Sequence, residues 1–198
     1  AAVGAIVLIR RPAPVSSPLE PPVQLTFFND SALLPSLSPG GRMVTFVRGG
    51  PFASSAPRGQ VYVKILPTGD PVQLTRDQSN KAQPVFSPDG SRIIYTAVQS
   101  TKWDSWQVPV LGGAPQPFLP NASGLIWLDD RRLIYSEIMS GLHMGIVTST
   151  VSRSEQREVY YPEHERAMAH YSYLSPDRRW VLISEMDRTA TFQPCRLT

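Results

Sequence analysis

The sequence has little cysteine, little net charge and no hydrophobic run long enough to cross a bilayer, and each shortage excludes a class of protein. A single cysteine, Cys195, excludes an internal disulfide and any zinc site built from two cysteines and two histidines. The formal net charge of +3 is small for 198 residues, and no run of basic residues alternates with aromatic residues. A nucleic-acid partner is therefore not indicated.

Motifs that carry catalysis are missing as well. The sequence contains no Gly-x-Ser-x-Gly nucleophile elbow, no phosphate-binding glycine loop and no kinase catalytic loop. His164 and His170 are six residues apart, which does not place them on one helical face, and the aspartates at the turns lack the dense acidic spacing of a calcium loop. We therefore predict no catalytic residue, no metal site and no cofactor for this chain.

An apolar stretch, Ala1–Ile9, opens the sequence and ends at the pair Arg10-Arg11. It is shorter than the roughly 20 residues that span a bilayer, so it fits the end of a signal-peptide core, a buried strand or the last turns of a membrane helix. We favour a membrane-helix tail for residues 1–11, because arginines suit lipid headgroups and no cleavage motif follows. Residues 12–22 hold five prolines and predict a stiff spacer. Contact with a membrane is expected through this N-terminal helix only.

Proline and glycine are abundant, and many of them belong to a repeated pattern. The segment Pro22–Thr26 (PVQLT) recurs unchanged as Pro71–Thr75, 49 residues later, and with the same shift Leu37–Phe46 aligns with Phe86–Tyr95. Two independent segments that share one shift indicate a true repeat rather than an accidental match. Two further copies follow, so that apolar or aromatic anchor residues stand at positions 37, 86, 127 and 174.

Each copy predicts a strand, a tight turn and a second strand. In Ser-Pro-Asp-Gly the proline fixes φ, the aspartate can bond the local backbone and the glycine accepts a positive φ. The triplets after the turns are β-branched, aliphatic or aromatic, and a third strand is expected about 20 residues after each anchor. One short helix, of at most two turns, is expected at Pro162–His170.

A repeated unit of roughly 40–50 residues that contains several short strands is typical of a propeller blade. The predicted fold is all-β: a β-propeller of about four blades of short antiparallel strands over residues 23–198, incomplete, with the sequence ending inside the third strand of the last blade.

At the turns the sequence resembles the TolB-like family of β-propeller repeats. The resemblance rests on residues 35–41, 84–90 and 171–177, with Gln-Leu-Thr at 24–26 and 73–75, and it covers about residues 22–198. The copy at 84–90 matches closely. Elsewhere Gly40 replaces the aspartate, Arg178 replaces the glycine, and the third copy lacks Ser-Pro.

The order of helix tail, proline-rich spacer and repeats is also similar to the C-terminal part of certain bacterial membrane proteins. In these, a cytoplasmic Ser/Thr protein kinase or a winged-helix regulator precedes the membrane helix. The resemblance implies a propeller anchored at the inner membrane and placed in the periplasm or outside the cell, where it senses a protein, peptide or glycan ligand. The chain itself is not expected to be an enzyme, although the parent protein could be a Ser/Thr kinase.

Two alternatives to this function remain open. One is the propeller portion of a prolyl-oligopeptidase-like peptidase, and the other is a periplasmic TolB-like scaffold.

The aromatic residues divide into two groups. Those at regular strand positions are expected in the core between blades: Phe46, Tyr62, Phe86, Tyr95, Trp106, Trp127, Tyr135 and Tyr173. Residues placed less regularly, where loops held by a rigid ring are the usual binding surface, are candidates for a recognition face. These candidates are Trp103, Trp180, Tyr160, Tyr161 and His170.

Overall fold

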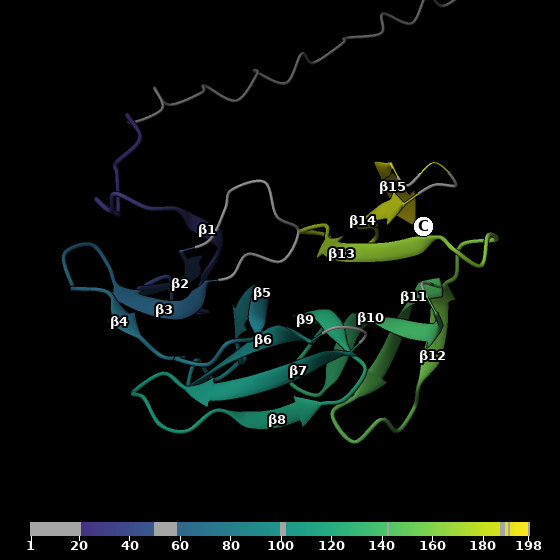
Figure 1. Cartoon of the computed structure of the whole chain (residues 1–198), viewed down its shortest axis with the longest axis horizontal. Coiled ribbons are helices and arrows are strands. Elements are labelled where there is room, and N and C mark those ends of the chain that lie inside the picture. Colours follow the sequence, from purple (N-terminus) through teal and green to yellow (C-terminus); the bar gives the residue numbers. More distant parts are fainter. Residues whose placement is uncertain are drawn as a thin grey trace, which may run out of the picture.

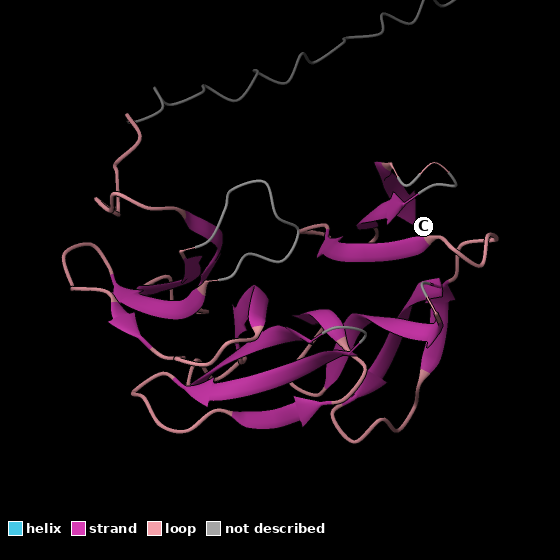
Figure 2. Cartoon of the chain, viewed as in Figure 1, coloured by secondary structure: helices cyan, strands magenta, loops and turns pink. Residues whose placement is uncertain are grey.

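The computed structural model describes residues 21–49, 59–99, 102–141, 143–186, 189 and 191–197. The described residues form fifteen β-strands and contain no helix (Figures 1 and 2). The strands form small antiparallel sheets that follow one another along an open arc (Figure 1). The predicted fold class is thereby confirmed, because these sheets resemble the blades of a propeller.

Blades 1 and 2 are four-stranded meanders in which each strand pairs with the next along the chain. The strands of blade 1 are β1 (Ala32–Leu37), β2 (Met43–Arg48), β3 (Gln60–Ile65) and β4 (Val72–Gln73). The strands of blade 2 are β5 (Asn80–Phe86), β6 (Arg92–Gln99), β7 (Lys102–Pro109) and β8 (Gln116–Leu119).

Blades 3 and 4 continue the pattern and touch through one parallel bridge, Met144 to Met168. The strands of blade 3 are β9 (Ser123–Trp127), β10 (Arg132–Ser140), β11 (His143–Thr150) and β12 (Arg157–Tyr160). Blade 4 has three strands among the described residues: β13 (Met168–Leu174), β14 (Val181–Met186) and β15 (Phe192–Leu197). The four predicted anchors are the last residues of β1, β5, β9 and β13, so the repeat located the first strand of every blade.

The turn after the anchor is closed by the hydrogen bonds that its residues predict. In blade 2 the Arg92 N–H donates to Ser87 Oγ (3.0 Å), Ser87 Oγ donates to Asp89 Oδ1 (2.5 Å), and Gly90 has a φ of +70°. The hydroxyl groups of Ser87 and Ser91 lower the pKa of Asp89 to about 2 by donating to its carboxylate. Ser175 and Asp177 repeat the arrangement in blade 4.

Arg178 occupies the turn position at which blade 2 has Gly90, and its φ is +57°. A side chain in the left-handed region costs roughly 1 kcal/mol relative to glycine, and Arg178 is exposed, so little packing would be lost. We predict that Arg178→Gly raises the free energy of unfolding by about 0.5–1 kcal/mol, measured by urea unfolding followed by tryptophan fluorescence. The matched control is Arg179→Gly, at a neighbouring exposed residue without a positive φ, which should leave stability unchanged or lower it. Equal effects of the two changes would contradict the prediction.

The hydrophobic core lies between successive blades rather than within any one sheet. Val61 of blade 1 packs with Ile93 and Tyr95 of blade 2, and Ile94 of blade 2 packs with Leu133 and Tyr135 of blade 3. A third cluster joins blades 3 and 4. The predicted core aromatics are buried or half-buried, with one exception.

Tyr173 is that exception, because 54% of its surface is exposed. Tyr173 stands at the repeat position of Val85 and Ile126, which pack against the clusters shared with the following blade, and among the described residues no blade follows blade 4 to cover it.

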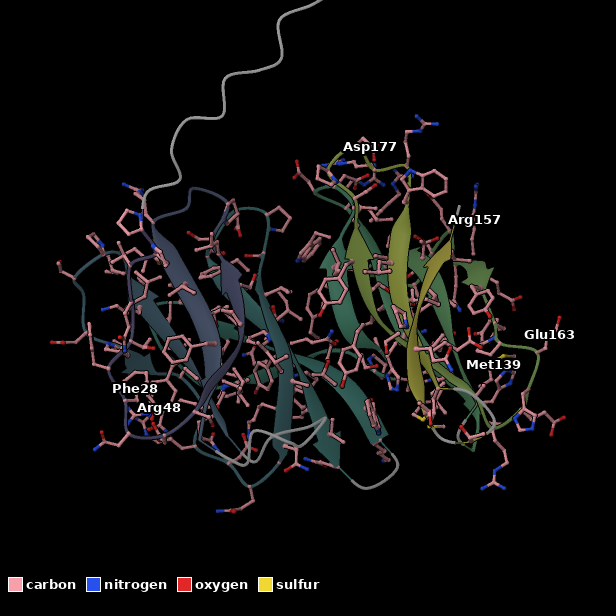
Figure 3. The ribbon with its side chains drawn as sticks, turned by 90° about the horizontal axis from the view of Figure 1, so that it is seen from above. Phe28, Arg48, Met139, Arg157, Glu163 and Asp177 are labelled. Atoms are coloured by element: carbon pink, nitrogen blue, oxygen red, sulfur yellow. The ribbon has the colours of Figure 1, made fainter. Side chains whose placement is uncertain are left out.

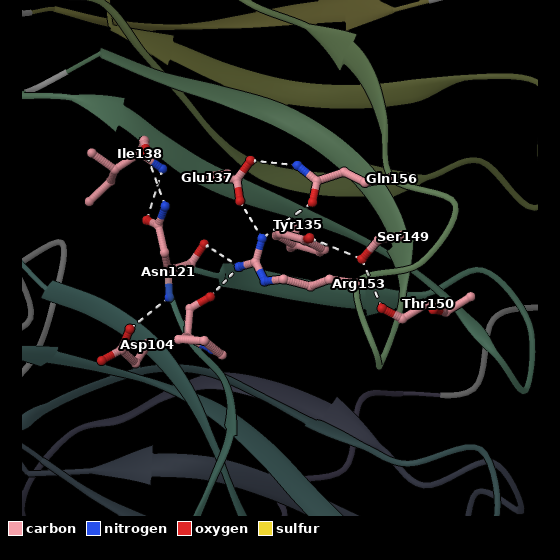
Figure 4. A network of polar contacts seen from close by, with 10 residues as sticks. Asp104, Asn121, Tyr135, Glu137, Ile138, Ser149, Thr150, Arg153 and Gln156 are labelled. Atoms are coloured by element: carbon pink, nitrogen blue, oxygen red, sulfur yellow. Dashed lines mark hydrogen bonds and ion pairs between the residues drawn. The ribbon is translucent and has the colours of Figure 1, made fainter.

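A polar network joins blade 2 to blade 3 on the outside of this core (Figure 4). Arg153, in the turn between β11 and β12, pairs with Glu137 and donates to the carbonyls of Pro120 and Asn121. The side-chain amide of Asn121 donates to Ile138 O (2.9 Å) and accepts from the Ile138 N–H (3.1 Å). The backbone N–H of Asn121 donates to Asp104 Oδ1 of β7 (2.7 Å). The network therefore fixes how these two blades are oriented.

The short helix expected at Pro162–His170 is wrong. Residues 161–167 form a loop with a single turn, in which the Ala167 N–H donates to His164 O (2.8 Å). From Met168 onward the chain is β13, and His170 pairs with Ser184 of β14. Pairing with β14 gives the backbone of this segment stable hydrogen bonds, whereas an isolated helix of two turns is too short to be stable.

The predicted membrane-helix tail, residues 1–11, and most of the predicted spacer, residues 12–22, lie outside the described residues. In the part of the chain that the structure describes, no helix is long and apolar enough to span a membrane.

Candidate functional site

Each innermost strand carries a bulge three residues before its anchor. At this position φ is positive in all four blades: Leu34 (+55°), Gln83 (+44°), Gly124 (+62°) and Tyr171 (+54°). The register of pairing with the next strand shifts at the same place. Nothing in the sequence marks the position, because four different residue types hold it. A Cβ on Gly124 would lie 2.5 Å from Gln83 Oε1, so the bulges of blades 2 and 3 are in direct contact.

Two of the predicted recognition residues meet at one of these bulges. The ring of Trp103, from β7 of blade 2, lies 5.3 Å from the ring of His170, from β13 of blade 4. His170 also stacks on Tyr171, with ring centroids 5.1 Å apart and planes 23° apart. This end of β7 therefore contacts blade 4, although blade 3 lies between the two blades in the sequence.

The electrostatics of this aromatic cluster suit stacking better than proton transfer. Only 3% of His170 is exposed, and desolvation lowers its pKa to about 4. Burial likewise raises the pKa of Tyr171, with a smaller contribution from Tyr173. Both rings are neutral at pH 7, so the cluster presents the half-buried faces of Trp103 and Tyr171 rather than a charge.

A groove of about 520 Å³ lies at the other end of the strands, between blades 2 and 3. Its apolar lining comes from Ile94, Phe118 and Trp127, and the rings of Phe118 and Trp127 are 6.1 Å apart. The indole N–H of Trp127 is buried and has no hydrogen-bond partner among the described residues. The groove therefore presents an aromatic surface, formed by these two rings.

The rim of the groove carries fixed charges. Asp89 and Asp130 line it from the turns of the two blades, and Arg92 lines it with its guanidinium held by a bond from Nη1 to Gln107 Oε1 (3.2 Å). Because its pKa is about 2, Asp89 is ionised at every pH at which the protein would be expected to work. An apolar floor with a few placed polar groups is the usual composition of a binding site.

Sequence reasoning missed this groove. It assigned Trp127 to the core and Asp89 and Asp130 to the turns, because each makes sense within its own repeat. The available signal was that two successive anchors, Phe86 and Trp127, are both followed by acidic turns.

The remaining candidates for a recognition face lie apart from both places. Trp180 is in the turn before β14, where its backbone N–H donates to Ser175 Oγ (3.0 Å). Tyr160 donates its hydroxyl to Glu185 Oε2 (2.6 Å), and Tyr161 packs edge-on against His143 (5.7 Å). The structure thus brings Trp103 and His170 together and leaves the other three in two separate places.

Within the described ranges, no group of three or more histidine, cysteine or acidic residues is placed to hold a metal ion. The groove and the aromatic cluster offer stacking surfaces and carboxylates, which is chemistry suited to recognition.

No family model and no curated protein sequence matches the chain. Solved structures do. A protein assigned as TolB from Agrobacterium tumefaciens is 19% identical, with a TM-score of 0.62 over 85% of this chain and 58% of that one. TolB from Acinetobacter baumannii is 16% identical, with a TM-score of 0.59 over 83% of this chain and 42% of that one.

A peptidase from Mycobacterium tuberculosis that hydrolyses puromycin is also similar, at 16% identity and a TM-score of 0.61, over 84% of this chain and 27% of that one. The chain therefore spans less than two thirds of the length of each. At these identities the likeness shows the fold alone: a β-propeller like those of TolB proteins and peptidases.

Proposed function

We propose that the chain is the ligand-binding propeller of a membrane-anchored bacterial signalling protein, acting in the periplasm or outside the cell, and that a peptide segment occupies the groove between blades 2 and 3. The observation that carries the proposal is the groove itself, with its aromatic lining and its charged rim. The propeller binds rather than catalyses, and any catalytic activity, such as that of a Ser/Thr kinase, belongs to another part of the parent protein.

The chemistry of the groove favours a peptide that carries a basic residue. Phe118 and Trp127 would contact an apolar or planar side chain of the peptide. Two carboxylates, Asp89 and Asp130, outnumber the single guanidinium of Arg92 on the rim, so the rim attracts a cation.

The test is a displayed library of short linear peptides selected on the protein, followed by affinity measurement on the enriched peptides by fluorescence anisotropy. Asp130→Lys reverses a rim charge on an exposed side chain, and we expect it to weaken a basic peptide about tenfold. The matched control is Glu165→Lys, on an exposed side chain that does not line the groove, which should leave the affinity within about twofold. Failure to enrich any peptide, or equal loss in both variants, would overturn the proposal.

The membrane anchorage rests on Ala1–Ile9 and the two arginines that follow it. Its test is a pair of reporter fusions to the parent gene at the end of the propeller, one reporter active only outside the cytoplasm and one only inside. Activity of the cytoplasmic reporter would contradict the proposed location without affecting the binding proposal.

A further inference from the structure

The second strands of the four blades differ at one equivalent position. In each blade the anchor pairs with a residue of the second strand, and the position four residues after that partner is held by Arg48, Ala97, Glu137 and Glu185. In blades 1, 3 and 4 this side chain is long and charged. In blade 2 it is a buried alanine. The position therefore gives blade 2 a different surface from the other three blades.

Arg48 fills this place in blade 1 (Figure 3). Its guanidinium carbon lies 3.8 Å from the ring centroid of Phe28 and 5.5 Å from that of Tyr62. Its Nε donates to Asp30 Oδ1 (2.9 Å), and both Phe28 and Asp30 belong to the segment that leads into β1. Aromatic rings and a carboxylate thus hold a guanidinium of the chain itself.

An arginine occupies the corresponding place in blade 3 as well, although it comes from a different element (Figure 4). Glu137 pairs with Arg153, whose guanidinium carbon lies 5.4 Å from the ring centroid of Tyr135. Arg153 also donates to the carbonyls of Pro120 and Asn121, in the segment that leads into β9. Blades 1 and 3 therefore share a guanidinium held by an aromatic ring and a carboxylate.

In blade 2 the same place is a pocket of about 370 Å³, on the face that packs against blade 1. Ala97 lines it together with two aromatic side chains, Tyr95 and Trp106. Tyr95 corresponds to Tyr135 by its place in the second strand, and Trp106 corresponds to Tyr62 by its pairing in the third. Blade 2 thus has counterparts of both rings, and the short side chain of Ala97 leaves room beside them.

Asp77 supplies a carboxylate to this pocket from the segment that leads into β5. Its Oδ1 accepts from Lys81 Nζ (2.5 Å) and from the Ser79 N–H (2.8 Å), whereas no described residue donates to its Oδ2. The side chain of Asp77 is half exposed. Burial raises the pKa of Tyr95, and the negative charge of Asp77 adds to the rise, so a protonated hydroxyl faces a carboxylate here. One oxygen of Asp77 is therefore available to a donor.

We propose that this pocket binds an arginine side chain of another protein, with the guanidinium against Tyr95 and Trp106 and hydrogen-bonded to Asp77 Oδ2. The buried ammonium of Lys81 offsets much of the charge of Asp77, so the planar, stacking shape of the guanidinium decides recognition and a lysine fits less well. The site does not depend on the groove, because Trp106 and Gln107 are successive residues of β7 and face opposite sides of blade 2.

The test is an NMR titration of the chain with N-acetyl-arginine amide, followed through the indole N–H signals of its four tryptophans. The signal of Trp106 should move with a dissociation constant of about 1 mM, as expected for so small a ligand, while that of Trp127 in the groove stays in place. Trp106→Val, which places there the residue type that blade 3 has at Val147, assigns the signal. N-acetyl-lysine amide should bind at least about fivefold more weakly.

Two changes of similar size at Ala97 give the matched comparison. Ala97→Glu copies the residue that holds Arg153 in blade 3 and should tighten arginine binding about fivefold. Ala97→Leu fills the pocket without a charge and should weaken binding by at least about fivefold. A general disturbance of the blade would weaken binding in both variants.

Three results would overturn the inference. The first is no movement of the Trp106 signal at an arginine concentration about tenfold above the expected dissociation constant. The second is movement of the Trp127 signal alone, which would place the arginine in the groove. The third is a loss of affinity in both Ala97 variants.

Discussion

Replacing Gly145 by alanine should lower the free energy of unfolding by about 3 kcal/mol. Gly145 lies in β11, and a Cβ there would be 2.1 Å from Cδ1 and 2.2 Å from Cε1 of Tyr161. Real Cβ atoms do not approach other atoms so closely, so the tyrosine ring would have to leave its place.

The ring has little room to move. Tyr161 packs against the cluster that joins blades 2 and 3, its edge meets His143, and burial raises its pKa to about 12. Moving it would expose apolar surface and open space beside Val147. The cost should therefore exceed the roughly 1 kcal/mol of an ordinary substitution.

Urea unfolding followed by tryptophan fluorescence measures the effect. The matched control is Gly141→Ala, which meets no atom within 4 Å and has a φ of +55°, so it should cost only about 1 kcal/mol of backbone strain. In a Tyr161→Ala background the penalty of Gly145→Ala should fall below about 1 kcal/mol, because the clash is gone. An unchanged penalty in that background would contradict the explanation, and a small penalty in the parent would mean that Tyr161 swings freely and is available to a ligand.

Tyr161 illustrates what sequence reasoning could and could not reach here. The spacing of the repeat predicted the first three strands of each blade and the turns at Ser87 and Ser175, because each depends on residues close together in the chain. The place of Tyr161, in the loop after β12, depends on Gly145 of β11, sixteen residues earlier, and no local pattern relates the two. An irregular aromatic therefore looked available for recognition although it fills a gap between strands.

The same distinction applies to the candidate site. The contact of Trp103 with His170 joins residues 67 positions apart from blades that are not neighbours, and it depends on the curvature of the arc. The groove depends on two turns coming together, Asp89 from one blade and Asp130 from the next. A repeat predicts each blade, whereas packing between blades is decided by side chains at positions where the copies differ.

The helix expected at Pro162–His170 failed for a related reason. Its proline and acidic residues fit a helical first turn. His170 is stabilised more by its place in β13, however, because there it pairs with Ser184 and is buried against Trp103. Tertiary packing overrode a weak local preference.

Acidification from pH 6.5 to pH 4 should lower the free energy of unfolding by about 3 kcal/mol through His170 alone. Burial lowers the pKa of this imidazole from an ordinary value of 6.5 to about 4, because the charged form would lose its hydration. The contacting ring of Tyr171, whose pKa is raised, stays neutral throughout this range.

The direction of the effect follows from which state binds the proton. Above pH 6.5 neither the folded nor the unfolded chain protonates His170, and its full contribution is present. Between pH 6.5 and 4 the unfolded chain takes up a proton that the folded chain resists, so stability falls as the pH falls. Below about pH 4 both states are protonated and this group causes no further loss. The turn carboxylates of Asp89 and Asp129, with pKa values of about 2, lose their contribution only below about pH 4.

Urea unfolding at a series of pH values tests this, with His170→Phe as the variant that keeps an aromatic ring against Trp103 and Tyr171. The difference in stability between the parent and His170→Phe should change by about 3 kcal/mol between pH 6.5 and 4 and stay constant above pH 7. His164→Gln, in the loop before β13, is measured beside it as the comparison variant. A flat difference for His170→Phe would mean that the imidazole takes up its proton in the folded state at an ordinary pKa. An imidazolium is stable there only if water reaches the ring or if the face of Trp103, 5.3 Å away, compensates its charge. That outcome would turn the aromatic cluster from a buried contact between blades into an accessible, charge-sensitive surface, and it would move the search for the ligand from the groove to the bulge of β13.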